Sequence, residues 1–272
     1  MAIDLITISE VGTKDFLRVH KNDSLYNLIK ALRKNEVDRA VVYGEHGAEG
    51  MVTLKDIVSK IGSTKSMRMP VSTLHVSSVM SYPLIKLPYD TSVAKAARVM
   101  LENNISSIPA EKEGKIVALF SKWDIAKLLY EDKTPITEIM TSSVTKVSET
   151  DSLIMVRRLM IDNGLSTLPV INPSNNEAVG IVTLTELVNT LVDIIDEFAD
   201  SGDKDFLRRV RVGDIMRPLV PAVSPSESVG RAARLMIEKN IRGVLIMEED
   251  IIRGIVTLTD LTRYVTLKLV TP

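Results

Sequence analysis

The sequence predicts an α/β protein of four similar β-α-β-β-α units, and three observations support this fold class. A serine recurs at positions 24, 92, 152 and 228, with an apolar residue 13 positions after each. A hydroxyl residue that opens a Thr-x-x-Asp pattern follows 29 positions after the serine in three units and 31 in the third. Apolar residues between these anchors switch from helical to strand-like spacing. Such agreement in spacing indicates an internal repeat.

A helix is the first clear element of each unit. The serine suits its N-cap, and apolar residues follow at i, i+3, i+4 and i+7. Three units carry this face in full: Leu25, Leu28, Ile29 and Leu32; Val93, Ala96, Ala97 and Met100; Val229, Ala232, Ala233 and Met236. In the third unit Arg157 interrupts the face, although Leu153, Val156 and Met160 keep their places.

Two strands and a second helix complete each unit. The runs "RAVVY", "SSIPA", "STLPVI" and "RGVLIM" read as strands, and a turn follows each. The third unit's two extra residues fall in its turn, "NPSNNE", where insertions are tolerated. The next strand ends in Thr-x-x-Asp, and a closing helix begins there. Residues 193–211 are acidic and then basic, which predicts an extended helix and a linker between units three and four.

Three units are also preceded by a methionine signature, at Met80, Met140 and Met216, while Gly12 takes this position ahead of the first. Units this small bury little core alone, so we expect them to pack in pairs.

Composition excludes several classes of protein. The chain has 272 residues, a net charge of −1, no cysteine and 4% aromatic residues. A balanced charge and few aromatics disfavour nucleic-acid binding. The lack of cysteine and of paired histidines disfavours disulfides and zinc sites. No signal peptide or membrane-spanning run is visible, so we expect a cytoplasmic protein.

The β-α-β-β-α unit that ends in "GIVTLTDL" resembles the cystathionine-β-synthase (CBS) domain. Four copies resemble the γ regulatory subunit of AMP-activated protein kinase. The resemblance implies four repeats, residues 1–65, 66–132, 133–197 and 198–272. It pairs them into two Bateman modules, 1–132 and 133–272, which form a flat disc with nucleotide clefts between repeats. The stretch after Met140 and residues near Leu165 are then expected to face the fourth Thr-x-x-Asp.

Thr-x-x-Asp has two interpretations. As a capping box it satisfies backbone groups at a helix start and contributes about 1 kcal/mol. By the resemblance, the hydroxyl and the acid instead hold a ribose, while the residue two before the hydroxyl lines the adenine pocket. The implied residues are Met51, Thr53 and Asp56; Ser121 and Asp124 after Leu119; Thr183 and Glu186 after Ile181; and Ile255, Thr257 and Asp260. Glu186 departs from the pattern, because its extra methylene places the carboxylate differently against a ribose.

Phosphates need cations, and arginine presents a planar fork to them. The resemblance assigns this role to residues at the start of the second strand, where this chain has Arg39 and Arg242. A solvated surface charge is the competing interpretation of each arginine. Gly243 leaves room beside Arg242. Lys122 and Arg253 are weaker candidates, expected to be surface residues.

The resemblance therefore implies a non-catalytic regulatory protein, without a cofactor or metal, that binds AMP, ADP or ATP and informs a protein target. S-adenosylmethionine is a second candidate ligand, since its ribose would be recognised alike. The sequence also leaves open a nucleic-acid-binding protein, an enzyme, or a scaffold with empty clefts. A homodimer is compatible with the sequence.

Overall fold

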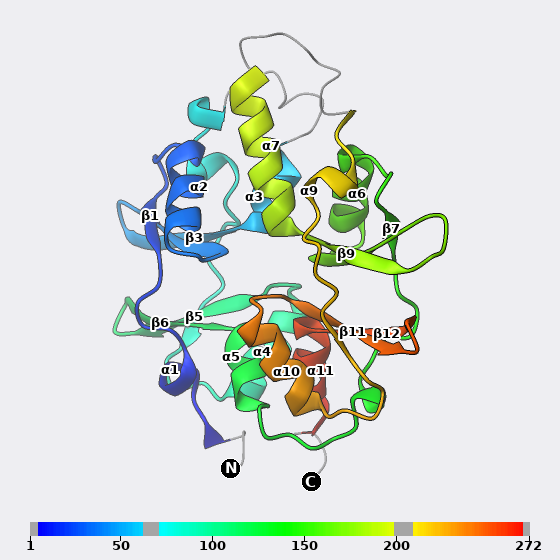
Figure 1. Cartoon of the computed structure of the whole chain (residues 1–272). Helices are drawn as coiled ribbons and strands as arrows, with labels where there is room; N and C mark the ends of the chain where they lie inside the picture. Colours follow the sequence, from blue (N-terminus) through cyan, green and yellow to red (C-terminus); the bar gives the residue numbers. More distant parts are fainter. Residues whose placement is uncertain (1–4, 62–70, 199–208, 269–272) are drawn as a thin grey trace. The chain divides into compact units, whose positions relative to one another are not determined.

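The computed structural model describes residues 5–61, 71–198 and 209–268. In these ranges it forms four three-stranded sheets, each belonging to one β-α-β-β-α repeat (Figure 1), as the sequence predicts. Repeat 1 comprises β1 (Arg18–His20), α2 (Leu25–Lys34), β2 (Arg39–Gly44), β3 (Gly47–Thr53) and α3 (Leu54–Lys60). Repeat 2 comprises β4 (Leu87–Pro88), α4 (Val93–Glu102), β5 (Ser107–Lys112), β6 (Lys115–Ser121) and α5 (Lys122–Leu128).

The second half of the chain repeats this order. Repeat 3 comprises β7 (Val147–Ser148), α6 (Leu153–Asp162), β8 (Thr167–Ile171), β9 (Ala178–Thr183) and α7 (Leu184–Phe198). Repeat 4 comprises β10 (Ala222–Val223), α10 (Val229–Glu238), β11 (Gly243–Glu248), β12 (Ile251–Thr257) and α11 (Leu258–Lys268). In each sheet the first strand runs parallel to the second, and the second runs antiparallel to the third. The parallel pair is joined through the first helix of the repeat, as such a connection requires.

The first helix of every repeat begins where the sequence predicts. The four anchor serines are its N-caps, and each side chain accepts a hydrogen bond from a backbone N–H three residues on. The predicted apolar faces are buried, and every side chain of these faces in repeats 1, 2 and 4 is at most 2% exposed. The amphipathic pattern therefore reports the core directly.

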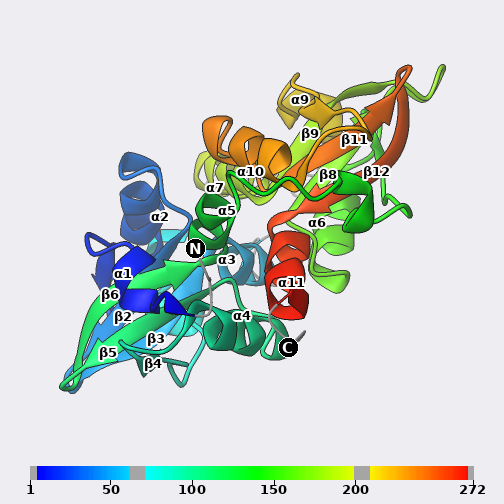
Figure 2. The same ribbon diagram turned by 90° about the horizontal axis from the view of Figure 1, so that it is seen from below.

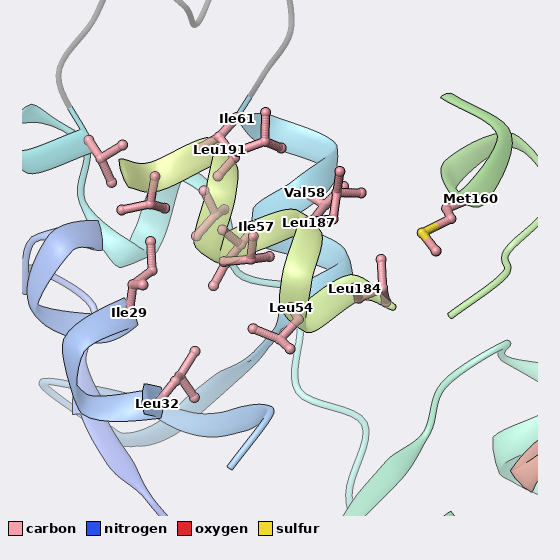
Figure 3. Close-up of a cluster of buried hydrophobic side chains, with 14 of the residues drawn as sticks. Ile29, Leu32, Leu54, Ile57, Val58, Ile61, Met160, Leu184, Leu187 and Leu191 are labelled. Atoms are coloured by element: carbon pink, nitrogen blue, oxygen red, sulfur yellow. The ribbon is translucent and has the colours of Figure 1, made fainter. Parts of the chain in front are cut away.

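The described chain divides into two compact units. The odd-repeat unit contains repeats 1 and 3 (17–61, 71–84, 145–198 and 209–220), and the even-repeat unit contains repeats 2 and 4 (5–16, 85–144 and 221–268). In the even-repeat unit α5 packs against α10 and α11, and α11 also packs against α4 (Figure 1). In the odd-repeat unit α3 packs against α6 and α7. Figure 3 shows Ile57, Leu187 and Leu191 of α3 and α7 gathered in this core.

Consecutive repeats exchange the short segments that precede them, which we call leading segments (residues 6–13, 74–81, 134–141 and 210–217). The segment ahead of repeat 1 binds repeat 2, where Ile6 O accepts the N–H of Val93 at 2.9 Å. The segment ahead of repeat 2 returns to repeat 1, where Leu74 O accepts from Leu25 at 2.6 Å. The segments ahead of repeats 3 and 4 are exchanged in the same way. Figure 2 shows α1 (Ile8–Val11), part of the first leading segment, beside β6.

Arg157, which interrupts the apolar face of repeat 3, has a structural explanation. Its Nε donates to the carbonyls of Val58 and Ile61, both at 2.9 Å, and an Nη donates to Ser59 O at 3.0 Å. These carbonyls lie at the end of α3, where a helix leaves them without intrahelical partners. Arg157 thus caps a helix of repeat 1 from a helix of repeat 3.

The predicted extension of the helix after repeat 3 is present. Helix α7 runs from Leu184 to Phe198, whereas α3 and α5 have seven residues each. The expected linker falls mostly on residues 199–208, and the expected boundary near residue 65 on residues 62–70. Both stretches lie outside the described residues.

Candidate functional site

Every repeat carries its hydroxyl and its acid where the third strand meets the second helix. Thr53, Ser121, Thr183 and Thr257 are the last residues of β3, β6, β9 and β12. The next residue begins a helix, so the acid falls in the first helical turn. A buried strand and a packed helix therefore hold both side chains of each pair in place.

One carboxylate oxygen of each aspartate pair is committed to the helix cap. Asp56 Oδ2 accepts the Thr53 backbone N–H at 2.8 Å and the Thr53 hydroxyl at 2.6 Å. The same two bonds measure 2.9 and 2.8 Å in repeat 2, and 2.8 and 2.6 Å in repeat 4. The capping box predicted from the sequence is thus confirmed at these junctions. A ligand would have to be held by the second oxygen.

In the odd-repeat unit, leading segments supply the partner of that second oxygen. Asp56 Oδ1 accepts the Ser81 hydroxyl at 3.0 Å. Glu186 forms the same cap as the aspartates, with Oε2 accepting the Thr183 N–H at 3.0 Å and also the Thr183 hydroxyl. Its Oε1 lies 3.9 Å from Arg217 Nε. Ser81 and Arg217 are at equivalent positions, directly after the methionine of their leading segment. The residue at this position therefore determines whether the acid faces a hydroxyl or a cation.

In the even-repeat unit, the acid is held instead by a basic residue one turn further along its own helix. Lys127 Nζ donates to Asp124 Oδ1 at 3.3 Å, and an Nη of Arg263 donates to Asp260 Oδ1 at 2.8 Å. The two carboxylates are 2% and 8% exposed as side chains, whereas the two cations are 53% and 55% exposed. Each buried carboxylate therefore keeps its Oδ1 on a cation that faces solvent, and a ligand would have to displace that cation.

The residue predicted to line the adenine pocket is a backbone partner of a leading segment in all four repeats. Two N–H···O bonds of 2.8 to 3.1 Å join each pair: Met51 with Ser81, Leu119 with Thr13, Ile181 with Arg217, and Ile255 with Thr141. The stretch after Met140 therefore reaches the fourth Thr-x-x-Asp, as the sequence predicts. Leu165 belongs to the odd-repeat unit, and its approach to that site stays a prediction.

A glycine stands directly before this lining residue in three repeats and admits the leading segment. A Cβ there would come closer to a methionine sulfur than an ordinary contact: 3.0 Å for Gly50 and Met80, 3.2 Å for Gly180 and Met216, and 3.1 Å for Gly254 and Met140. In repeat 2 the glycine is in the leading segment instead of on the strand: Gly12 lies in the segment and Ala118 on β6. A Cβ at Gly12 would lie 2.6 Å from Ile8 O and 3.2 Å from Leu119. No methionine fits that backbone, which explains its absence ahead of repeat 1.

Arg39 is a buried residue. It lies directly across from Thr53 in the sheet, and its side chain is 7% exposed. It donates from Nε to Asp38 Oδ1 at 2.5 Å and from an Nη to Asp38 Oδ2 at 2.9 Å. The interpretation as a solvated surface charge is therefore wrong for Arg39. Its role as a phosphate-binding residue stays a prediction.

Arg242 is half-buried at the corresponding end of β11. Its carbonyl accepts the N–H of Leu258, the first residue of α11, at 3.0 Å. Gly243 follows it and lies across from Thr257. A Cβ at Gly243 would meet Ile255 and Thr257 at 3.5 Å, an ordinary contact distance. The room expected beside Arg242 stays a prediction.

The two weaker phosphate candidates differ from each other. Arg253 is exposed and pairs with Glu248 at 2.9 Å, as expected for a surface residue. Lys122 is 7% exposed, so the expectation that it lies at the surface is wrong. Its Nζ donates to Thr259 Oγ1 at 3.0 Å.

Sequence reasoning missed the partners of the second carboxylate oxygen. Lys127 and Arg263 stand three residues after their acid, which is a helical spacing that could have pointed to them. Ser81 and Arg217 lie 25 and 31 residues beyond theirs. Only the methionine signature beside them could have shown that this segment returns to the preceding repeat.

Metal-binding clusters and membrane-spanning helices are absent from the described ranges. In 5–61, 71–198 and 209–268 no group of three or more histidine or carboxylate side chains could hold a metal ion. No helix in the same ranges has the length and apolarity needed to cross a membrane.

Four strand-to-helix junctions with paired hydroxyls and acids, in four exchanged β-α-β-β-α repeats, define a tandem CBS protein. The CBS domain family matches residues 8–63, 76–131, 136–193 and 212–267. Because these ranges cover most of the chain, the chain belongs to the CBS-domain family. Four domains in series agree with the four repeats described above.

Three relatives show how far the likeness extends. Protein MJ1225 of Methanocaldococcus jannaschii is 23% identical over 92% of this chain and 95% of its own length. Its crystal structure, presented as that of a candidate archaeal homologue of γ-AMPK, covers 95% of this chain with a TM-score of 0.84 and 22% identity. At this identity the likeness shows the fold. Uncharacterised protein MJ1404 of the same organism is 25% identical over 95% of this chain.

The third relative is a homoserine O-acetyltransferase of Methanosphaera stadtmanae, which is 31% identical over 65% of this chain. The chain spans 35% of that enzyme's length and 61% of the length of MJ1404.

Proposed function

We propose that this chain is a regulatory protein that binds adenine nucleotides, namely AMP, ADP or ATP, at its strand-to-helix junctions. One observation carries the proposal. Each acid of these junctions commits one oxygen to the helix cap and keeps the other outside it, on Ser81, Lys127, Arg217 or Arg263. A cap alone needs only the first oxygen.

The second oxygen suits a ribose. A fixed carboxylate oxygen can accept hydrogen bonds from the two hydroxyls of a ribose, as an acid does in dinucleotide-binding folds. The apolar residue two positions earlier lies on the same face of the strand, because side chains alternate along it. It can therefore contact the base, while Arg39 and Arg242 lie at the neighbouring strand for a phosphate.

The competing function is a scaffold whose junctions only cap helices. The completeness of the capping boxes favours it. Calorimetric titration with AMP, ADP and ATP separates the two, with GMP and GTP as matched nucleotides of another base. We expect adenine nucleotides to bind at least about tenfold more tightly, which corresponds to about 1.4 kcal/mol. Absent or equal binding across the set would reject the adenine proposal. An S-adenosylmethionine arm tests the second adenosyl ligand.

The four sites are not equivalent, and we propose that those of Asp56 and Asp260 fill first. Each has a complete Thr-x-x-Asp, with Arg39 or Arg242 at the neighbouring strand. The third site has Glu186 in place of the aspartate, and the extra methylene of glutamate places its carboxylate differently against a ribose. Crystals soaked with limiting AMP should show density at the first two sites. Density confined to Glu186 would reverse this order.

We infer that repeats 1 and 2 form one Bateman module, 1–132, and repeats 3 and 4 the other, 133–272. The exchange of leading segments between consecutive repeats supports this pairing. We further propose that the chain is non-catalytic and transmits ligand binding to a protein target, because a ligand shifts a conformational equilibrium when its affinity differs between states. The disc, the cytoplasmic location and the homodimer stay predictions from the sequence.

A further inference from the structure

Lys122 joins two of the candidate sites within the even-repeat unit. It follows the cap residue Ser121 directly, at the start of α5. Its Nζ donates at 3.0 Å to the hydroxyl of Thr259, the residue directly before Asp260 in the first turn of α11. The ammonium group therefore lies between the junction of repeat 2 and the junction of repeat 4, and it is buried.

The other repeats show that this position does not need a charge for packing. The residue after the cap hydroxyl is Leu54, Leu184 or Leu258 in repeats 1, 3 and 4, and these side chains are 7%, 4% and 5% exposed. Repeat 2 places an ammonium group in the same buried position. Burying a charged group costs desolvation free energy that a buried leucine does not incur. The lysine therefore points to a role beyond the core.

The electrostatics of the junction favour an anion. Helix α11 has 11 residues, and its N-terminus carries partial positive charge. Lys122 adds a full positive charge beside that turn. The carboxylates Asp124 and Asp260 already hold Lys127 and Arg263 through their second oxygens. These five side chains carry three positive charges and two negative ones at pH 7.

We propose that Lys122 makes the paired sites of repeats 2 and 4 selective for phosphorylated adenosyl ligands over neutral or cationic ones. This inference rests on the proposed function, because it needs an adenosyl ligand at the junction. The ammonium group leaves Thr259 and donates to a ligand phosphate. In the odd-repeat unit Leu54 and Leu184 take this position, so the sites of repeats 1 and 3 lack this source of selectivity.

The chain supplies its own probe for this site. Trp123 is the single tryptophan of the sequence and stands between Lys122 and Asp124, so its emission reports on the junction of repeat 2. Wild type and Lys122→Met are titrated with adenosine, AMP, ADP and ATP, with calorimetry of the same samples as the second readout. Methionine keeps most of the length and the burial but removes the charge. Lys122→Arg restores the charge.

We expect Lys122→Met to weaken AMP binding about tenfold and ATP binding more, since a charge-assisted hydrogen bond contributes roughly ten- to a hundredfold. Adenosine affinity should stay within about twofold, and Lys122→Arg should recover part of the nucleotide affinity. Lys115→Met is the matched control, because it removes the same charge from the exposed start of β6. It should leave all four affinities unchanged.

The outcomes separate this inference from the function on which it rests. If the wild type binds none of the four ligands, the proposed function fails. If it binds them but Lys122→Met weakens adenosine and ATP equally, Lys122 has only a structural role. Unchanged affinities in Lys122→Met likewise reject the inference. If Lys122→Met does not fold, Lys122→Gln provides the uncharged variant, and thermal unfolding without ligand confirms its integrity.

Discussion

The sulfur of Met140 lies against the backbone of Gly254, where an added Cβ would come within 3.1 Å of it. The same Cβ would lie 3.0 Å from the carbonyl oxygen of Thr141. The glycine thus admits a leading segment of another repeat to the edge of β12. This contact holds together the part of the chain on which the fourth site is built.

We expect Gly254→Ala to lower the free energy of unfolding by about 1–3 kcal/mol, because overpacking forces neighbours to move. Shortening the methionine in the double variant Gly254→Ala with Met140→Ala should recover part of this loss. Gly180→Ala, whose Cβ would lie 2.4 Å from the backbone oxygen of Arg217, should not be rescued by Met216→Ala. Urea unfolding of both double-mutant cycles measures this. Equal coupling free energies in the two cycles would contradict the interpretation that the methionine limits the space at Gly254 and the backbone limits it at Gly180.

Arg157 provides a second test of how the repeats hold together. Arg157→Met should destabilise the protein by about 2 kcal/mol, since it leaves the carbonyls at the end of α3 without their charged donor. Arg158→Met is the matched control in the same helix. Arg158 is 83% exposed and forms an ion pair with Asp162 on the helix surface, so its loss should stay within about 0.5 kcal/mol. Urea midpoints that fall equally in both variants would reject the capping role.

Much of the architecture follows from the sequence because it depends on local patterns. The serine N-caps and the apolar i, i+3, i+4 spacing are written within each helix, and a core face needs nothing else. The four strand-to-helix junctions follow from Thr-x-x-Asp for the same reason. Arg157 was visible as a break in the pattern, but its partners lie about 100 residues away. No local pattern reveals them.

The candidate site was predictable only in part. The hydroxyl, the acid and the lining residue belong to one strand and one helix, so their proximity could be inferred. The burial of Arg39 and Lys122 could not, since a charged residue in an apolar run is normally read as a surface residue. The return of each leading segment to another repeat depends on how consecutive repeats pair, which spacing alone does not encode.

The pH dependence of stability should reveal the contact between α11 and the linker ahead of repeat 3. Asp132 accepts hydrogen bonds from Lys268 Nζ at 2.8 Å and from Tyr264 at 3.0 Å. Burial alone would raise the pKa of Asp132, but bonds from Lys268, Thr134 and Tyr264 outweigh it and lower that pKa below 3.8. The hydrogen bond to Asp132 raises the pKa of Lys268 above 10.5.

A lowered carboxyl pKa stabilises the fold above pH 3.8, and the contribution is lost as the pH falls through the folded value. A raised lysine pKa stabilises it below pH 10.5, and that contribution is lost as the pH rises through the folded value. The stability difference between wild type and Lys268→Met should thus be constant near about pH 5–9 and shrink on both sides. It should stay below about 1 kcal/mol, because Lys268 is half-exposed. Urea unfolding at several pH values measures it, and a difference that grows in acid would contradict the contact.

Asp260→Asn separates the two roles of the Thr-x-x-Asp acid. The amide oxygen of asparagine can still accept the Thr257 N–H, so the cap should weaken by only a fraction of its ~1 kcal/mol. The second carboxylate oxygen of Asp260 is affected more. In asparagine an uncharged amide nitrogen takes its place and presents donors where a ribose needs an acceptor. Affinity for AMP at this site should fall roughly ten- to a hundredfold, while the melting temperature without ligand barely moves.

Asp214→Asn is the cap-only control, since Asp214 accepts the Arg211 N–H at 2.8 Å at the start of the short helix α9 (Val212–Ile215). It should leave AMP affinity unchanged. If Asp260→Asn instead lowers the melting temperature by several degrees and leaves AMP affinity intact, the acid is a helix cap alone.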